Sequence, residues 1–284
     1  MIGLLLKVYI SSDMFLHPWD ERYHALVAKN MLNHPLVPTL FENPILEYDY
    51  KMWTYNHIWV HKQPVALWGI ISSLALFGVN SFAVRIPSIL LTSLGTIISY
   101  QFGKKIFSRR IGLLSAFFYA TNGLILEISS GRITTDHVDI FFLFFVQLSA
   151  YLAWEFAQRK SMWINVLCGI AIGLAILSKW LPALIVLPIW GAFILHSKQF
   201  SFKEIIVHGL ILVLTVAAIA LPWQLYIHSQ FPLEAAWESS FNTKHLFETI
   251  EVEAQPWYYH FTMLRINYGE LIYLPLIWFA FKTI

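Results

Sequence analysis

Long runs of apolar residues recur along the chain, and they limit the folds that it can adopt. The runs fall at 84–103, 111–128, 138–157, 162–178, 180–196, 205–227 and 268–283. A helix of about 20 apolar residues crosses the ~30 Å hydrocarbon core of a bilayer. Only 13% of the residues are charged, whereas soluble domains carry about 25%. We therefore predict an all-α, polytopic membrane helix bundle with about seven full spans.

The two ends of the chain suggest that it is part of a longer protein. The apolar start, "MIGLLLKVYISS", is too short for a full span, so we expect it to be the clipped end of a first transmembrane helix. The chain also stops inside the apolar run "LIYLPLIWFAFKTI". We therefore expect residues 1–284 to form a single transmembrane domain whose C-terminal portion is absent.

The positions of lysine and arginine predict which loops face the cytoplasm. Basic residues follow the first, third and fifth spans, at Lys104, Lys105, Arg109, Arg110, Arg159, Lys160, Lys198 and Lys203. Cytoplasmic loops carry an excess of such residues, and these three loops share one side if the short run 64–78 does not cross the membrane. Residues 11–83, with surface helices, and residues 228–267 then form extracytoplasmic loops that hold most of the carboxylates.

The stretch "HPWDERY" places two carboxylates, Asp20 and Glu21, directly after the apolar start. Helix capping alone can explain them, because Pro18 suits a first helical position and acidic residues in a first turn complement the helix dipole. Catalysis is the alternative, because a surface helix at the mouth of the bundle would place a carboxylate where it can act as a general base. Tyr23 would lie near the same substrate.

Two further stretches place lysines at the ends of apolar segments. "HKQP" puts His61 and Lys62 before the short apolar run, and "GLAILSKW" ends on Lys179. A lysine at such a boundary can extend its ammonium to the lipid headgroups without any further role. A lysine that faces the bundle could instead hold an anion.

The stretch "SGRITTDHVD" surrounds the start of a span with Arg132, Asp136 and Asp139. The two aspartates are three residues apart, so they can share one face of a helix. A structural ion pair with Arg132 is one explanation. The other is function, because ionisable residues at membrane depth are costly and usually mark a site.

The last extracytoplasmic loop contains His245, Trp257 and Tyr258. Aromatic residues are common at the membrane interface. In a binding role, the three side chains would contact the acceptor or the sugar.

These stretches together combine carboxylates with cations on one face of a membrane protein. Such a set suits transfer from a lipid-phosphate donor, because a carboxylate can take the proton of the attacking hydroxyl and fixed cations can stabilise the leaving phosphate. A lipid-diphosphate-dependent glycan ligase or polymerase is one alternative. A secondary transporter is another, although transporters usually place polar residues or helix breaks near the middle of the membrane.

The order of the motifs resembles that of the GT-C membrane glycosyltransferases of family 39, which include protein O-mannosyltransferases and bacterial lipid A aminoarabinose transferases. The resemblance rests on "DERY", "KQP" before "LW", "LFGVNSFAVRIPSILL", "GRITTD", "GLAILSKW", "LPWQLYI" and "QPWYYHF", which follow the family's order from about residue 13 to 275. The chain departs from the family's pattern at His61, Gln63 and Trp180.

The resemblance implies a GT-C-like bundle that transfers a sugar, with inversion, from a polyprenyl-phosphate donor to an acceptor hydroxyl on a lipid, glycan or protein. It implies that Asp20 handles the acceptor hydroxyl, that Lys62 and Lys179 lie near the donor phosphate, and that Arg132 and Asp136 form the second external motif.

Residue types and resemblance together give a full set of candidate site residues. Catalytic candidates are Asp20, Glu21 and Asp136; donor-phosphate candidates are Lys62, Arg132, Lys179 and His61; acceptor or sugar candidates are Tyr23, Asp139, His245, Trp257 and Tyr258. We expect no required cofactor, although aspartate oxygens at three of these positions could hold a divalent cation. The expected location is the inner membrane of a bacterium, with the site on the periplasmic face.

Overall fold

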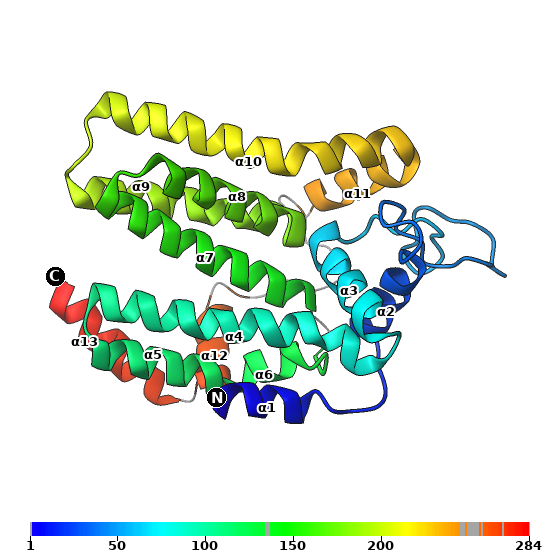
Figure 1. Ribbon diagram of the computed structural model, residues 1–284, viewed down its shortest axis with the longest axis horizontal. Helices are drawn as coiled ribbons and strands as arrows, with labels where there is room; N and C mark the ends of the chain where they lie inside the picture. Colours follow the sequence, from blue (N-terminus) through cyan, green and yellow to red (C-terminus); the bar gives the residue numbers. More distant parts are fainter. Residues whose placement is uncertain are drawn as a thin grey trace. The chain divides into compact units, whose positions relative to one another are not determined.

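The computed structural model describes residues 2–133, 137–244, 248, 256, 258–268 and 270–283 (Figure 1). Helices dominate this part of the chain, and its one bridge between extended segments joins Thr39 to Ile58. The chain divides into two compact units, Met1–Trp237 and Glu238–Ile284.

Four long helices form the core of the first unit. α4 (Ser81–Ile106), α7 (His137–Arg159), α8 (Met162–Lys179) and α10 (Phe202–Gln230) are long and apolar enough to cross a membrane. α7 packs against both α4 and α8, and α8 packs against α10. The predicted all-α membrane bundle is therefore confirmed.

Two glycines explain why α8 and α10 pack closely. Gly169 and Gly173 are one helical turn apart, and a Cβ at either would come within 2.7 Å of Thr215 or 2.6 Å of Ile219 on α10. Small residues at this spacing let the backbones of two membrane helices approach each other.

Two of the predicted spans in the first unit are interrupted. α5 (Arg109–Thr121) and α6 (Gly123–Ser129) meet at an angle of 49°. The side chain of Asn122 accepts a hydrogen bond from the backbone N–H of Ile125 at 3.0 Å, so it caps α6 and begins a new helix. With this bent pair taken as one span, the described residues hold up to five candidate spans instead of about seven.

The run after α8 is also divided. Trp180 adopts a positive φ of 67°, and a 3₁₀ helix, η1 (Leu181–Ile185), precedes α9 (Val186–Ser197). Pro182 lies in η1 and has no backbone N–H to donate. α9 has only 12 residues, fewer than a full span needs.

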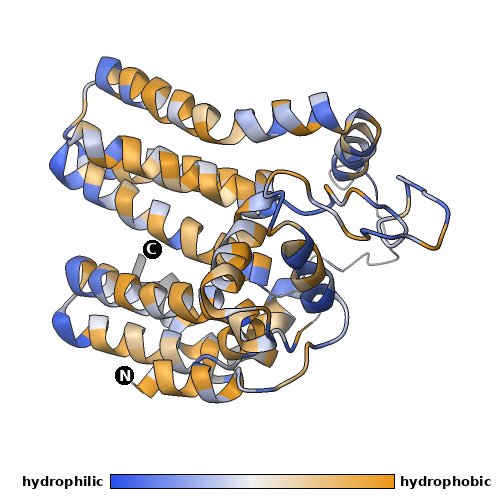
Figure 2. Ribbon diagram, turned by 45° about the vertical axis from the view of Figure 1, so that its right-hand side comes forward, coloured by the Kyte–Doolittle hydropathy of each residue, from blue (hydrophilic) through white to orange (hydrophobic). Residues whose placement is uncertain are grey.

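The ends of the bundle differ in character. The α4–α5, α7–α8 and α9–α10 connections lie at one end, on the left in Figure 1, and they carry the basic residues of the three predicted cytoplasmic loops. α2 (Asp20–Asn30) and α3 (Pro64–Phe77) lie at the other end. Figure 2 shows apolar residues along the long helices and hydrophilic residues gathered at their ends. α1 (Ile2–Ile10) packs against α4, α5 and α6.

The surface helices α2 and α3 have an apolar core of their own. Val27, Met31, Leu67 and Ile70 are at most 1% exposed, and they belong to one cluster. The side-chain amide of Asn30 donates hydrogen bonds to two carbonyls of the following loop, at 3.2 and 3.0 Å. The packing fixes α2, and with it the residues at its first turn.

The second unit contains short helices. α11 (Pro232–Lys244) begins in the first unit and ends in the second, and α12 (Tyr259–Tyr268), η2 (Glu270–Ile272) and α13 (Tyr273–Thr283) follow. The hydroxyl of Tyr273 donates a hydrogen bond of 2.6 Å to the carbonyl of Phe261. The predicted span 268–283 is not one helix, because it contains both η2 and α13, and α13 has only 11 residues.

Candidate active site

Asp20 and Lys62 face each other at the end of the bundle that carries α2 and α3. Asp20 is the first residue of α2, and Lys62 lies two residues before α3. Nζ of Lys62 is 3.9 Å from Oδ2 of Asp20, and the two side chains are 27% and 24% exposed. The carboxylate and the ammonium thus meet in a partly open position, where both can contact a substrate.

Four aromatic rings pack together in the segments that carry this pair. His61, next to Lys62 in the chain, stacks on Trp53 with ring centroids 5.7 Å apart and 15° between the planes. Tyr23, on α2, meets Trp53 edge-on at 4.9 Å and stacks on Trp59 at 6.3 Å. Aromatic pairs at such distances stabilise their mutual geometry. The rings therefore connect the segment that carries Lys62 to the helix that carries Asp20.

Lys179 and Asp139 form a second ion pair. Lys179 is the last residue of α8, Asp139 lies in the first turn of α7, and the lysine ammonium donates a hydrogen bond to Oδ1 of the aspartate. The lysine side chain is 47% exposed and the aspartate 15%. The structure thus places a predicted phosphate ligand beside a predicted substrate contact.

Arg132 is paired with Asp13. Its Nη2 donates hydrogen bonds to Oδ2 of Asp13 at 2.8 Å and to the carbonyl of Ile10 at 3.1 Å. The Arg132 guanidinium holds the pKa of the Asp13 carboxyl below its usual range. From the sequence, Asp136 and Asp139 were the candidate ion-pair partners of Arg132. Asp136 lies outside the described residues.

Glu21 belongs to a fully buried cluster with Arg85 and His137. Nε and Nη2 of Arg85 donate to the two Glu21 carboxylate oxygens at 2.7 and 3.0 Å, and Nε2 of His137 is 3.4 Å from Oε1. All three residues are 0% exposed. Burial raises the pKa of Glu21, but the hydrogen bonds with His137 and Arg85 bring it below its usual value. The Glu21 side chain is therefore an ionised part of the core, whereas Asp20 faces Lys62.

Arg85 also holds the segment that leads into α2. Its guanidinium donates to the carbonyls of Ser11 at 3.0 Å, Asp13 at 2.8 Å and Phe15 at 2.7 Å. Sequence reasoning did not single out Arg85 or His137. The available signal was an arginine in the second turn of an apolar span, since ionisable residues in such helices are rarely incidental.

Gly131 allows the connection between α6 and α7 to approach this cluster. It has a φ of +73°, which glycine adopts without strain. A Cβ at this position would collide with the carboxylate of Glu21. The glycine of the "SGRITTD" stretch is thus required by its contact with the buried cluster.

The remaining candidates lie outside the described residues or in the second unit. Asp136, His245 and Trp257 lie outside them, and Tyr258 belongs to the second unit. Within the described ranges, no group of three or more His, Cys, Asp or Glu side chains could hold a metal ion.

Comparison with known sequences identifies the family. Residues 61–224 match the sequence model of the family described as dolichyl-phosphate-mannose-protein mannosyltransferase. The matched stretch is more than half of the chain, and it contains Lys62, Arg85, Arg132 and Lys179.

Curated relatives are named undecaprenyl phosphate-alpha-4-amino-4-deoxy-L-arabinose arabinosyl transferases. One from Pseudomonas aeruginosa strain LESB58 is 30% identical over 286 residues, which cover 93% of this chain and 46% of the relative. A second, transferase 2 of Pseudomonas fluorescens strain Pf-5, is 31% identical over 263 residues, covering 86% of this chain and 40% of the relative. The chain therefore spans about half the length of the curated relatives it matches.

Solved structures share the fold. The crystal structure of ArnT from Cupriavidus metallidurans bound to undecaprenyl phosphate has a TM-score of 0.70 at 18% identity, with 99% of this chain and 50% of that chain covered. The apo structure of the same protein also gives a TM-score of 0.70, at 17% identity, with 98% and 49% covered. The predicted GT-C-like fold is confirmed. With the family match over more than half of its length, the chain belongs to the dolichyl-phosphate-mannose-protein mannosyltransferase family of GT-C membrane glycosyltransferases.

Proposed function

We propose that the full-length protein transfers a sugar from a polyprenyl-phosphate carrier to an acceptor hydroxyl at the extracytoplasmic surface of the membrane. The observation that carries this proposal is the partly exposed Asp20–Lys62 pair at one end of the bundle. The names of the curated relatives describe an undecaprenyl-phosphate-linked aminoarabinose donor, and the solved ArnT structure holds undecaprenyl phosphate. Both support a polyprenyl-phosphate donor here.

In this reaction the acceptor oxygen attacks the anomeric carbon of the sugar. The bond between that carbon and the phosphate oxygen breaks, its electron pair stays on the phosphate, and polyprenyl phosphate leaves. Asp20 takes the proton of the acceptor hydroxyl, as a general base must. A single in-line displacement of this kind inverts the configuration at the anomeric carbon.

Lys62 has a second role in the proposal. Its ammonium can stabilise the leaving phosphate, where negative charge develops. When the phosphate replaces Asp20 as the partner of Lys62, the carboxylate is released to accept the proton. Lys179, which is 47% exposed, supplies a second cation at the same end of the bundle.

Replacing either lysine tests donor recognition. Lys62→Ala and Lys179→Ala in the full-length protein should each weaken binding of a polyprenyl-phosphate sugar about tenfold or more, because a hydrogen bond to a charged group contributes about 1.5–3 kcal/mol. Titration of the purified variants with the lipid measures this. Lys51→Ala is the matched control, since Lys51 is an exposed lysine of the same loop. Donor affinity of both variants equal to that of the wild type would refute the phosphate assignment.

Thiol labelling tests the side of the membrane. In a Cys168→Ala background, Lys51→Cys should react with an impermeant maleimide in intact cells, and Lys104→Cys should react only after permeabilisation. Both positions are exposed. Lys104 is in the last turn of α4 and Lys51 is in the segment between α2 and α3. The α4–α5 connection and the helices α2 and α3 lie at opposite ends of the first unit (Figure 1). Labelling of both from the same side would contradict the proposed orientation.

A further inference from the structure

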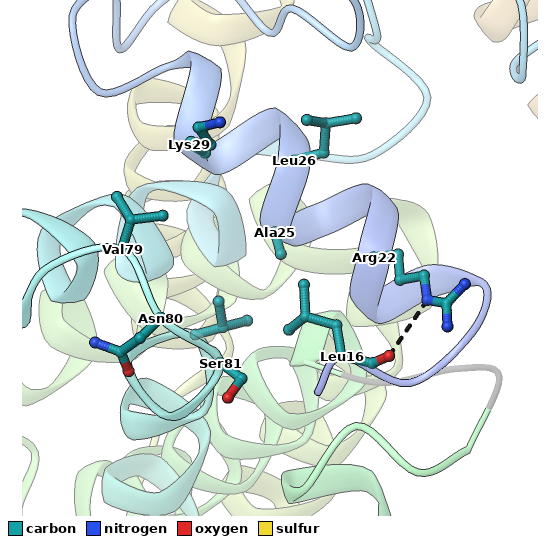
Figure 3. Close-up of a pocket in the computed structure, with 9 residues that line it drawn as sticks. Leu16, Arg22, Ala25, Leu26, Lys29, Val79, Asn80 and Ser81 are labelled. Carbon is teal, nitrogen blue, oxygen red and sulfur yellow. Dashed lines mark hydrogen bonds between the residues drawn. The ribbon is translucent and has the colours of Figure 1, made fainter. Parts of the chain in front are cut away.

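A cavity lies beside α2, and its lining includes neither Asp20 nor Lys62. Its volume is about 220 Å³. One wall is a single face of α2, made by Arg22, Ala25, Leu26 and Lys29 at helical spacings of three and four (Figure 3). The other wall is made by Leu16, Val79, Asn80, Ser81 and Val84.

The lining of the cavity is mostly apolar, and two exposed cations stand at its ends. Arg22 and Lys29 are seven residues apart on α2, so their backbones are about 10 Å apart on the same side of the helix. Figure 3 shows them at the two ends of the row, with Ala25 between them. Nε of Arg22 donates to the carbonyl of Leu16 at 3.2 Å, which keeps the guanidinium at the rim. None of the nine lining residues is Asp or Glu.

The position of the cavity relative to α4 sets its depth in the membrane. Asn80 caps α4 and Ser81 is its first residue, and α4 is a candidate span of 26 residues. The cavity is therefore at the level where a span leaves the hydrocarbon. Leu76, Phe77 and Val79, just before α4, are 77%, 58% and 59% exposed. Exposed apolar residues next to cations are typical of a protein surface at the lipid headgroups.

We propose that this cavity binds the phosphate headgroup of an anionic glycerophospholipid from the surrounding membrane. Arg22 and Lys29 contact the phosphate, and the apolar side chains of Leu16, Leu26 and Val84 contact the adjoining part of the lipid chains. A lipid supplies both the negative charge and the apolar surface that the lining requires. Because Asp20 begins the same helix, the bound lipid would also hold the base at a fixed height on the membrane.

Lipid titration of the purified full-length protein, followed by native mass spectrometry, tests the proposal. The wild type should bind phosphatidylglycerol in preference to phosphatidylcholine. The double variant Arg22→Gln/Lys29→Gln should bind phosphatidylglycerol roughly 30-fold more weakly, since each cation near an anionic lipid contributes about a fivefold factor. The double variant Lys198→Gln/Lys203→Gln removes one exposed cation from the α9–α10 connection and one from the first turn of α10, and it should bind as the wild type does.

A third variant separates the cavity from general surface charge. Ala25→Leu keeps both cations but fills space between them, so it should also weaken phosphatidylglycerol binding. Binding by Arg22→Gln/Lys29→Gln equal to that of the wild type would overturn the proposal. Full binding by Ala25→Leu would overturn it too, because the attraction would then not depend on the cavity. If the double variant fails to fold, the single variants Lys29→Gln and Ala25→Leu test the proposal in its place. Each should bind phosphatidylglycerol more weakly than the wild type, and full binding by either would overturn the proposal. No sugar donor takes part in this measurement, so the result is independent of the proposed activity.

Discussion

Asp20→Asn in the full-length protein should lower sugar transfer by about 10²–10⁴-fold while fold and donor binding remain intact. An amide cannot accept the proton of the acceptor hydroxyl, and general-base catalysis contributes a factor of this size. Radiolabelled transfer from a polyprenyl-phosphate sugar measures the rate, and thermal unfolding in detergent verifies the fold.

The competing explanation for Asp20 predicts a small effect. If the carboxylate only complements the dipole of α2, its loss costs about 0.3–1 kcal/mol. Trp19 is the N-cap of α2, and in the described part of the chain no side-chain hydrogen bond caps this helix. The structural contributions of Asp20 are therefore this dipole term and the partly exposed pair with Lys62, and such pairs are usually worth about 1 kcal/mol or less.

A matched control uses another aspartate of the same loop. Oδ1 of Asp49 accepts a hydrogen bond of 2.9 Å from the backbone N–H of Lys51, and an asparagine can make the same bond. Asp49→Asn should therefore leave transfer unchanged. Near-normal turnover by Asp20→Asn would remove Asp20 from the chemistry and leave Asp136 as the candidate base.

The bundle was predictable because long apolar runs leave few alternatives. Four of the predicted apolar runs coincide with long helices, α4, α7, α8 and α10. Pro64 is the first residue of α3, a position that proline favours. The interruptions were not predictable from run length. Asn122 begins a new helix inside a continuous apolar run, since a side-chain oxygen can cap a helix wherever the chain turns.

The candidate site was predictable as a set of charges but not as a set of pairs. Charged residues at the ends of spans pointed to Lys62 and Lys179, yet nothing in the sequence paired Lys179 with Asp139, 40 residues away. Asp20 and Glu21 are a second case in which the sequence did not give the partners of the side chains. Adjacent helical residues point about 100° apart, so one can face the core and the other the surface. Which of the two carboxylates is buried depends on Arg85, which is 64 residues from Glu21 in the chain.

The pairing of Glu21 with Arg85 changes what replacement of Glu21 should do. Sequence reasoning treated Glu21 as a second candidate catalytic carboxylate, and Glu21→Gln removes its charge. In the structure that substitution leaves Arg85 buried without its counter-charge. Removing one partner of a buried ion pair typically costs about 3–5 kcal/mol. We therefore expect Glu21→Gln and Arg85→Met each to lower the free energy of unfolding by about that amount, measured by denaturant unfolding of the full-length protein in detergent.

An exposed pair provides the matched control. Nζ of Lys160 is 2.8 Å from Oε1 of Glu204, and the two side chains are 35% and 41% exposed. Glu204 is also the N3 residue of a capping box on α10, a position where glutamine can replace glutamate. Glu204→Gln should therefore lower the free energy of unfolding far less than Glu21→Gln does, because exposed ion pairs contribute little to stability. Equal losses from Glu21→Gln and Glu204→Gln would contradict the buried cluster.

The double variant Glu21→Leu/Arg85→Met separates the ion pair from the other bonds of the cluster. Replacing both charges with apolar side chains removes the unpaired charge, so the double variant should be more stable than Arg85→Met alone. Recovery should be incomplete, because Arg85 also donates to the carbonyls of Ser11, Asp13 and Phe15. Those three bonds hold the segment that enters α2, and no apolar side chain can replace them. A double variant as stable as the wild type would show that the ion pair, and not these bonds, accounts for the contribution of Arg85 to stability.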